Sequence, residues 1–318
     1  MDVDALIADI TVAELEHDPY PLYARMRAER PVAFVPAAER WLVTRWADCE
    51  ALTRLDGALQ NSAQELDDYF GVPNILSMEG PEHRGLRAGV DAVFRPRAIA
   101  QSGMPERARA IADGYVARVR ARGACDATGD ILEPISVRVI GDMLGFGDLD
   151  DATLTRWFHE LSAGMTNFVG DPQVAARAAA TRADIDADLR IRIARLTREP
   201  DGSALASMIH VGSVDGRPRT FDQLVSSLRV ILLGGLQEPG HAAASSLLGL
   251  LSDPAQLAAV RADPATLLPL AVHEGLRWIA PFGFAERRAR RALEIGGAAI
   301  PAGGEIGLVP VSYTHLRA

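Results

Sequence analysis

One long helical pattern, over residues 220–251, dominates the sequence and is apolar along most of its length. Its centre follows the apolar run Val230–Leu233 and spells Gly-Gly-Leu-Gln-Glu-Pro-Gly over residues 234–240. Two adjacent glycines weaken a helix and a proline removes a backbone donor, so we expect either a kinked central helix or two helices joined by a turn. The polar pair Gln237 and Glu238 in such apolar surroundings requires a reason.

The remaining segments indicate more helices with a few short strands. Helical patterns alternate with Pro- and Gly-rich breaks, and residues 57–80 look irregular. We expect a mainly α fold with a small β region, formed by residues 1–310 as a single domain. The expected helices lie near residues 18–30, 46–55, 133–144, 151–165, 174–197, 254–262 and 266–278, with two more within 82–122, and the expected strands lie at 31–36, 40–44 and 294–309.

Composition excludes several classes of protein. The 318 residues include 33 arginines, no lysine and 42 acidic residues, and the net charge of −9 disfavours nucleic acid as the main partner. No apolar run is long enough to span a membrane, and the acidic N-terminus lacks the positive charge of a signal peptide, so we expect a cytoplasmic monomer without membrane contact. Two cysteines, Cys49 and Cys125, exclude a disulfide framework and a cysteine-rich zinc site.

Two short segments pair charged residues at helical spacing. His83 and Arg87 are four residues apart, so one helix face could present both to an anionic group, although a solvated face is the simpler interpretation. Glu274 and Arg277 are three apart among apolar neighbours. That setting is compatible with a partly buried ion pair, although an exposed pair that contributes little is the simpler interpretation.

Taken in order, these segments resemble the cytochrome P450 family of bacterial haem-thiolate monooxygenases over about residues 10–310. The stretch Gly80-Pro-Glu-His-Arg-Gly-Leu-Arg87 is similar to the family's C-helix, in which the His and Arg hold a haem propionate. The resemblance therefore implies this role for His83 and Arg87. Further matches are Asp18-Pro-Tyr-Pro-Leu-Tyr23, Arg40-Trp-Leu-Val-Thr-Arg45, Glu294-Ile-Gly-Gly297 and Ile300-Pro-Ala-Gly303.

Other site residues follow from the same resemblance. Glu274 and Arg277 match the Glu-x-x-Arg pair of the family's K-helix, which is a structural pair. The segment after it places Arg287 as the second propionate ligand. Gly234 and Gly235 match the distal I-helix, where they would border the haem and leave room for dioxygen.

The family's activity is the insertion of one oxygen atom from O2 into a small organic substrate at haem b, with electrons from a ferredoxin or flavodoxin. Arg84, Arg95 and Arg97 would form a basic docking face for that partner, or merely a solvated surface. Residues 57–80 and the helices around Gly170 would form the substrate lid. Four phenylalanines line the substrate pocket or pack in the core, namely Phe70, Phe168, Phe282 and Phe284.

The sequence departs from the family in the I-helix. The family shows an acid and then a Thr after the glycine pair, whereas this chain has Gln237 and Glu238 there, followed by Pro239. Gln237 cannot ionise, so we expect Glu238, with a pKa raised by burial, to take over proton delivery. A proline in this position also occurs in the family's peroxide-using branch, which keeps that alternative open.

A second departure concerns the haem ligand, a Cys in a Phe-x-x-Gly-x-His-x-Cys-x-Gly loop. The loop does not occur in this sequence, and neither Cys49 nor Cys125 has its context. We therefore expect no metal ligand in this chain, a truncation before the loop, and a tail over residues 311–318 that does not match the family. The alternative from another class is a catalytically inactive helical fragment.

Overall fold

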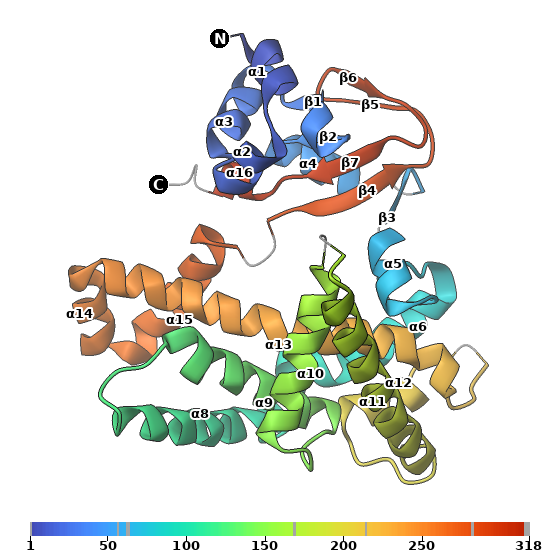
Figure 1. Cartoon of the computed structure of the whole chain (residues 1–318), viewed down its shortest axis with the longest axis vertical. Helices are drawn as coiled ribbons and strands as arrows, with labels where there is room; N and C mark the ends of the chain where they lie inside the picture. The colour runs from blue at the N-terminus through green and yellow to red at the C-terminus, as the bar shows by residue number, and fades with distance from the viewer. Residues whose placement is uncertain are drawn as a thin grey trace. The chain divides into compact units, whose positions relative to one another are not determined.

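The computed structural model describes residues 2–55, 57–61, 64–167, 170–213, 215–280 and 283–314. The chain forms two compact units, one of Met1–Ala63 with Ser245–Ala318 and one of Gln64–Ala244. Helix α13 (Phe221–Ser252), labelled in Figure 1, contributes residues to both units, because the boundary between Ala244 and Ser245 falls within it. The single domain expected over residues 1–310 stays a prediction.

The first unit contains a five-stranded sheet of order β1-β2-β7-β4-β3 and a separate β5-β6 hairpin. Strands β2 and β7 run parallel, with Trp41 opposite Ile306, and all other neighbouring strands are antiparallel. Its elements are α1 (Val3–Asp9), α2 (Val12–His17), α3 (Tyr20–Glu29), β1 (Val32–Val35), a 3-10 turn (Pro36–Ala38), β2 (Arg40–Val43), α4 (Trp46–Thr53), β3 (Leu59–Asn61), α14 (Pro254–Ala262), α15 (Pro264–Trp278), β4 (Ala285–Ala289), β5 (Leu293–Ile295), β6 (Ala298–Ile300), β7 (Glu305–Leu308) and α16 (Val311–Thr314).

Both faces of this sheet are covered. Leu42 and Val43 are neighbours on β2 but enter different apolar clusters, because successive side chains of a strand point to opposite faces. Leu42 packs with Met26 of α3, and Val43 packs with Leu52 of α4. A strand buried on both faces needs apolar residues in succession, which explains the run at the end of β2.

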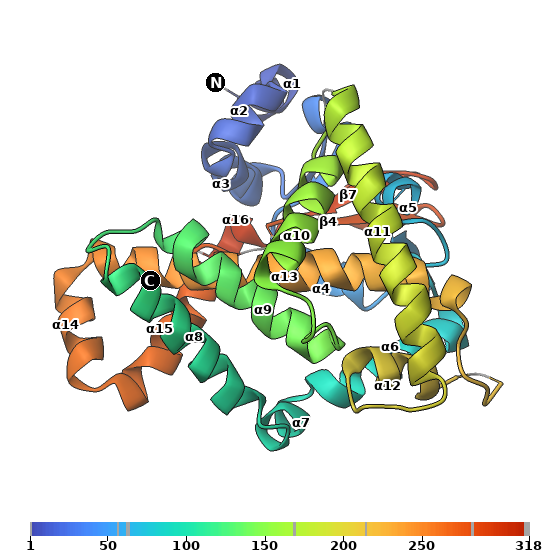
Figure 2. The same ribbon diagram turned by 60° about the horizontal axis from the view of Figure 1, so that its bottom comes forward.

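The second unit is helical. Its core joins residues of α6, α9, α10, α11, α12 and α13, including the fully buried Leu86, Leu154, Ile185 and Leu224. Helices α10 and α11 lie side by side (Figure 2), and Asp150 and Asp171 cap their N-termini by accepting backbone N–H bonds. The elements are α5 (Gln64–Phe70), α6 (Gly80–Phe94), α7 (Pro96–Gln101), α8 (Met104–Arg120), a π-helical turn (Thr128–Leu132), α9 (Glu133–Leu144), α10 (Asp151–Met165), α11 (Pro172–Leu196) and α12 (Ala204–His210), followed by α13.

The structure corrects three expectations. Helix α13 is continuous with Pro239 inside it, so the alternative of two helices joined by a turn is wrong. Residues 57–80 are not wholly irregular, because they contain β3 and α5. Residues 82–122 form three helices instead of two, since Pro96 begins α7 and Gly103, at a φ of 72°, separates it from α8.

Within the described residues, none of the helices combines the length and the apolar character that crossing a membrane requires.

Candidate functional site

The three glycines at the centre of α13 have different neighbours. A Cβ added at Gly235 would lie 3.2 Å from Cγ2 of Ile140 on α9, and one at Gly240 would lie 3.3 Å from Cα of Glu133. These two glycines therefore let α13 approach α9 closely. A Cβ at Gly234 would lie 3.7 Å from Oε1 of Glu238, its one neighbour within 4 Å among the described residues. Of the predicted glycine pair, Gly234 borders the Glu238 carboxyl and Gly235 packs against α9.

Pro239 leaves a polar backbone group without its helical partner. A regular helix would bond the N–H of residue 239 to the carbonyl of Gly235, but proline has no N–H. The Gly235 carbonyl is consequently an acceptor within an otherwise apolar helix. It lies one turn before Glu238, which concentrates two polar groups at this point of α13.

Glu238 is the ionisable group of this site. Burial of its carboxyl raises the pKa above the usual carboxyl value, and the neighbouring His241 acts in the opposite direction. The residue as a whole stays exposed. A carboxyl with a raised pKa keeps its proton to higher pH, as the sequence predicted for this residue. The side chain of Gln237 lies outside the described residues.

His83 and Arg87 lie on α6, which begins at Gly80 with Pro81 in its first turn. His83 is partly buried and Arg87 is exposed. Nη2 of Arg87 donates to Oδ1 of Asp91 at 2.8 Å, one turn further along the helix. The two predicted ligands thus share one face, and Arg87 has a carboxylate partner that another anion would have to replace.

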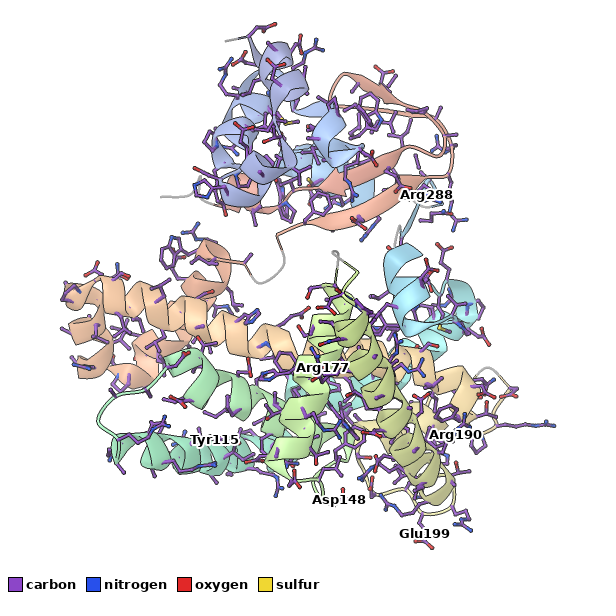
Figure 3. The ribbon with its side chains drawn as sticks, viewed as in Figure 1. Tyr115, Asp148, Arg177, Arg190, Glu199 and Arg288 are labelled. Atoms are coloured by element: carbon purple, nitrogen blue, oxygen red, sulfur yellow. The ribbon has the colours of Figure 1, made fainter. Side chains whose placement is uncertain are left out.

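Arg287 lies on β4 in the first unit. Burial lowers the pKa of its guanidinium, and Nη1 donates to the Glu286 carbonyl at 2.6 Å. Both neighbours of Arg287 on β4 form ion pairs. Glu286 pairs with Arg40, and Arg288 (Figure 3) pairs with Glu305. Arg287 has no such carboxylate partner among the residues that the structure describes. A half-buried cation without an anion is suited to an anionic ligand.

Glu274 and Arg277 form an ion pair on α15, in which Nε of Arg277 donates to Oε2 of Glu274 at 2.8 Å. The Glu274 side chain is 59% exposed and that of Arg277 is 31% exposed. Glu274 is therefore exposed, in agreement with the simpler interpretation, whereas the Arg277 side chain is partly buried. Several apolar residues of α15 are exposed as well, so apolar neighbours in sequence did not imply burial.

Helix α5 is fixed within the second unit by three side chains. The Tyr69 hydroxyl donates to the carbonyl of Leu161 on α10 at 2.8 Å. Arg182 of α11 donates to the Tyr69 carbonyl at 3.1 Å, and Arg229 of α13 donates to the Phe70 carbonyl at 3.0 Å. Two guanidinium groups at the C-terminal end of a helix also complement its dipole. We call Tyr69, Arg182 and Arg229 the α5 anchor.

The predicted pocket phenylalanines separate into two groups. Phe70 is buried in the core of the second unit, and Phe284 lies beneath the Arg40 guanidinium, so packing explains both. Phe168 and Phe282 lie outside the described residues. The sequence did not indicate Arg219, a buried guanidinium whose hydrogen bonds within the described residues all go to backbone carbonyls, because no local pattern marks it.

Comparison with known proteins defines the class. No protein-family model matches the chain. The fold is similar to that of CalO2, with a TM-score of 0.81 at 23% identity over 96% of this chain and 78% of that chain. It is also similar to that of substrate-free CYP109E1 from Bacillus megaterium, with a TM-score of 0.82 at 19% identity over 93% of this chain and 77% of that chain. Other similar structures are described as cytochrome P450 proteins, among them TbtJ1 and CYP109B1 from Bacillus subtilis.

Curated sequences show the family to which this fold belongs here. The cytochrome P450 monooxygenase PikC of Streptomyces venezuelae is 31% identical over 329 residues, which cover 99% of this chain and 74% of that protein. The 6-deoxyerythronolide B hydroxylase of Saccharopolyspora erythraea is 30% identical over 92% of this chain and 76% of that protein. The chain belongs to the cytochrome P450 family of monooxygenases. The predicted family, mainly α fold and oxidoreductase function are confirmed.

Proposed function

We propose that the protein containing this chain binds haem b and inserts one oxygen atom from O2 into a small organic substrate, with Glu238 as its proton donor. The observation that carries the proposal is the Glu238 carboxyl, which has a raised pKa and lies beside Gly234 at the centre of α13. Haem supplies, when bound, the iron centre for oxygen chemistry. The residues of this chain supply binding and protons.

Three cations are proposed to hold the haem carboxylates. Arg287 is half-buried and has no carboxylate partner within the described part of the chain, which fits this role. His83 and Arg87 share a face of α6, and Arg87 would exchange Asp91 for the ligand. The assignment follows the family pattern residue by residue. Neither cysteine is proposed as an iron ligand, since Cys49 is buried in α4 with its Sγ bonded to the Val43 carbonyl and Cys125 has no matching context.

Glu238 is proposed to replace the usual acid and alcohol pair of the family. As a neutral acid it can donate a proton from its carboxyl and recover one afterwards, which Gln237 cannot do. The Gly235 carbonyl, which cannot accept a hydrogen bond from Pro239, gives an acceptor one turn away. The two groups together could hold a polar molecule in place for proton transfer.

The partners remain proposals as well. Arg84, Arg95 and Arg97 are exposed and, within the described residues, take part in no ion pair, which suits docking of an acidic ferredoxin or flavodoxin. Residues 57–80 and the helices around Gly170 are the proposed lid over the substrate. The α5 anchor would then set how readily the lid opens. A cytoplasmic monomer is proposed for the whole protein.

The proposal is tested first by haem titration of the purified chain. Uptake of haem supports the proposed cofactor site, whereas no uptake supports the inactive fragment; since neither Cys49 nor Cys125 is proposed as the iron ligand, a thiolate-type reduced-CO spectrum of this chain would contradict that part of the proposal. Where turnover is measured, Glu238→Gln should slow it by about 10²-fold and lower the product formed per O2 consumed. Glu199→Gln, at an exposed position (Figure 3), is the control and should change neither quantity.

Two results would overturn parts of this proposal. Unchanged turnover and coupling in Glu238→Gln would remove Glu238 from proton delivery. Product formed with hydrogen peroxide alone, but not with a reduced ferredoxin, would favour the peroxide-using alternative that Pro239 suggests.

A further inference from the structure

Two glycines, Gly85 and Gly89, let helix α6 contact the backbone of α12 and of the turn that follows it. A Cβ added at Gly85 would lie 2.0 Å from the carbonyl oxygen of Gly212, in the turn that follows α12. One added at Gly89 would lie 3.1 Å from Cα of Met208, and the Ser207 hydroxyl donates to the Gly89 carbonyl at 2.6 Å. With no side chain between them, α6 must follow any movement of α12 and its turn.

Arg219 holds that turn in place. Its Nη1 donates to the carbonyls of Met208 and Val211, the latter at 2.9 Å, and its Nη2 donates to the carbonyl of Gly212 at 2.8 Å. Its backbone N–H donates to the Ile209 carbonyl at 2.9 Å. One guanidinium thus joins three carbonyls at the C-terminal end of α12, where a cation also complements the helix dipole.

The position of this guanidinium is unusual in two ways. It is buried, yet among the described residues no carboxylate lies within ion-pair distance. Burial lowers the pKa of the guanidinium, and the charges of Glu82 and Asp215 raise it by a smaller amount. Nη2 also lies 3.1 Å from the place of a Cβ at Gly85. The Arg219 side chain therefore occupies space that a side chain of α6 would otherwise take.

The face of α6 that carries His83 and Arg87 lies opposite the face that carries Gly85. With 3.6 residues per turn, His83 and Arg87 lie about 40° apart around the helix, and Gly85 lies about 160° from both. The face that rests on the Arg219 turn is consequently opposite to the face with His83 and Arg87. A shift of the turn would displace those two side chains as a unit.

We infer that Arg219 positions α6, and through it His83 and Arg87, for the binding of haem carboxylates. This inference rests on the function proposed above for His83 and Arg87. Arginine suits the role because its planar group carries five donors in a fixed geometry, whereas lysine offers one ammonium and leucine none. Arg219 is a positioning residue and touches no ligand.

The first test uses hydrogen exchange in the haem-free chain. Arg219→Leu should accelerate exchange of the α6 amides by about tenfold or more, the effect of losing one charge-assisted hydrogen bond, and Arg219→Lys should recover part of the protection. Arg192→Leu is the matched control, because Arg192 is equally buried but bonds to Asp148, Asp188 and the Gly145 carbonyl. It should leave α6 protected.

The second test measures haem affinity. Arg219→Leu should weaken haem binding by about tenfold, while Arg192→Leu keeps the wild-type affinity even if it lowers the melting temperature more. In the Arg87→Ala background, Arg219→Leu should cause a smaller further loss than in the wild type, since the two act through one contact.

The outcomes separate the inference from the proposed function. If the wild-type chain takes up no haem, the proposed function fails, and the cofactor role of Arg219 fails with it. If the wild type binds haem and Arg219→Leu binds it equally well, only the inference fails. A loss of affinity that follows the melting temperature alike in Arg219→Leu and Arg192→Leu would also overturn it.

Discussion

From the α5 anchor we predict that one substitution on α13, at Arg229, weakens the attachment of α5, which is distant from it in sequence. Nη1 of Arg229 donates to the Phe70 carbonyl, and its Nε lies 3.2 Å from Oδ1 of Asp186 in a two-point pair. Its side chain is only 17% exposed, so water screens these bonds incompletely. Arg229→Met removes them while retaining much of the apolar stem.

The magnitude follows from the bonds lost. Hydrogen bonds to charged groups are worth about 1.5–3 kcal/mol each, and the Asp186 carboxylate, 25% exposed, regains part of this by hydration. We expect the free energy of local opening of α5 to fall by about 2 kcal/mol, which is about 30-fold in the opening equilibrium. The amides of Gly71 and Leu76, both bonded within this segment, should exchange faster by that factor.

Hydrogen exchange read by mass spectrometry measures this directly. Arg177→Met is the matched control, because Arg177 (Figure 3) pairs with Glu160 on the surface of α10–α11 and its side chain is 53% exposed. An exposed pair contributes about 0–1 kcal/mol, so exchange near α5 should stay close to wild type. Equal acceleration in both variants, or none in Arg229→Met, would refute the assignment of Arg229 to the anchor.

Three further predictions concern stability. The raised pKa of Glu238 means that the native chain retains a proton that the unfolded chain has released, so wild-type stability should fall relative to Glu238→Gln as the pH rises through the interval between the two pKa values. Thermal unfolding over about pH 4–8 checks this, and a constant difference would contradict it. Asp171→Ala removes the cap of α11 and should cost about 1 kcal/mol, seen as a melting temperature lower by about 2–4 °C; no change would mean that the cap is dispensable. Arg192→Leu leaves Asp148 and Asp188 without their shared cation and should cost about 3 kcal/mol in urea unfolding, a larger loss than Arg177→Met causes.

Local signals explain which elements could be predicted. Helix α9 was expected over residues 133–144 and runs Glu133–Leu144, because Pro134 marks its first turn and Gly145, at a φ of 98°, ends it. Strand β4 was missed, since its sequence Ala-Glu-Arg-Arg-Ala has no apolar alternation. It is a strand because β7 and β3 pair with it, and neither pairing is visible locally.

The same distinction holds at the site. The shared face of His83 and Arg87 follows from their spacing on one helix, as does the Glu274–Arg277 pair. The exposure of Glu274 depends on what packs against α15, which the spacing does not determine. Arg219 could not be found from sequence, because its partners are backbone carbonyls brought together by the fold.

The parallel pairing of β2 with β7 has a consequence for biosynthesis. Trp41 of β2 pairs with Ile306 of β7, so about 265 residues are translated after β2 before its partner strand exists. At about 5–20 residues per second this takes roughly 13–53 s. Residues 64–244 contain their own core and can fold in that interval. Meanwhile the unpaired edge of β2 is open to other strands, so the early ribosome-bound chain is the stage at which a chaperone would most improve the yield of this protein.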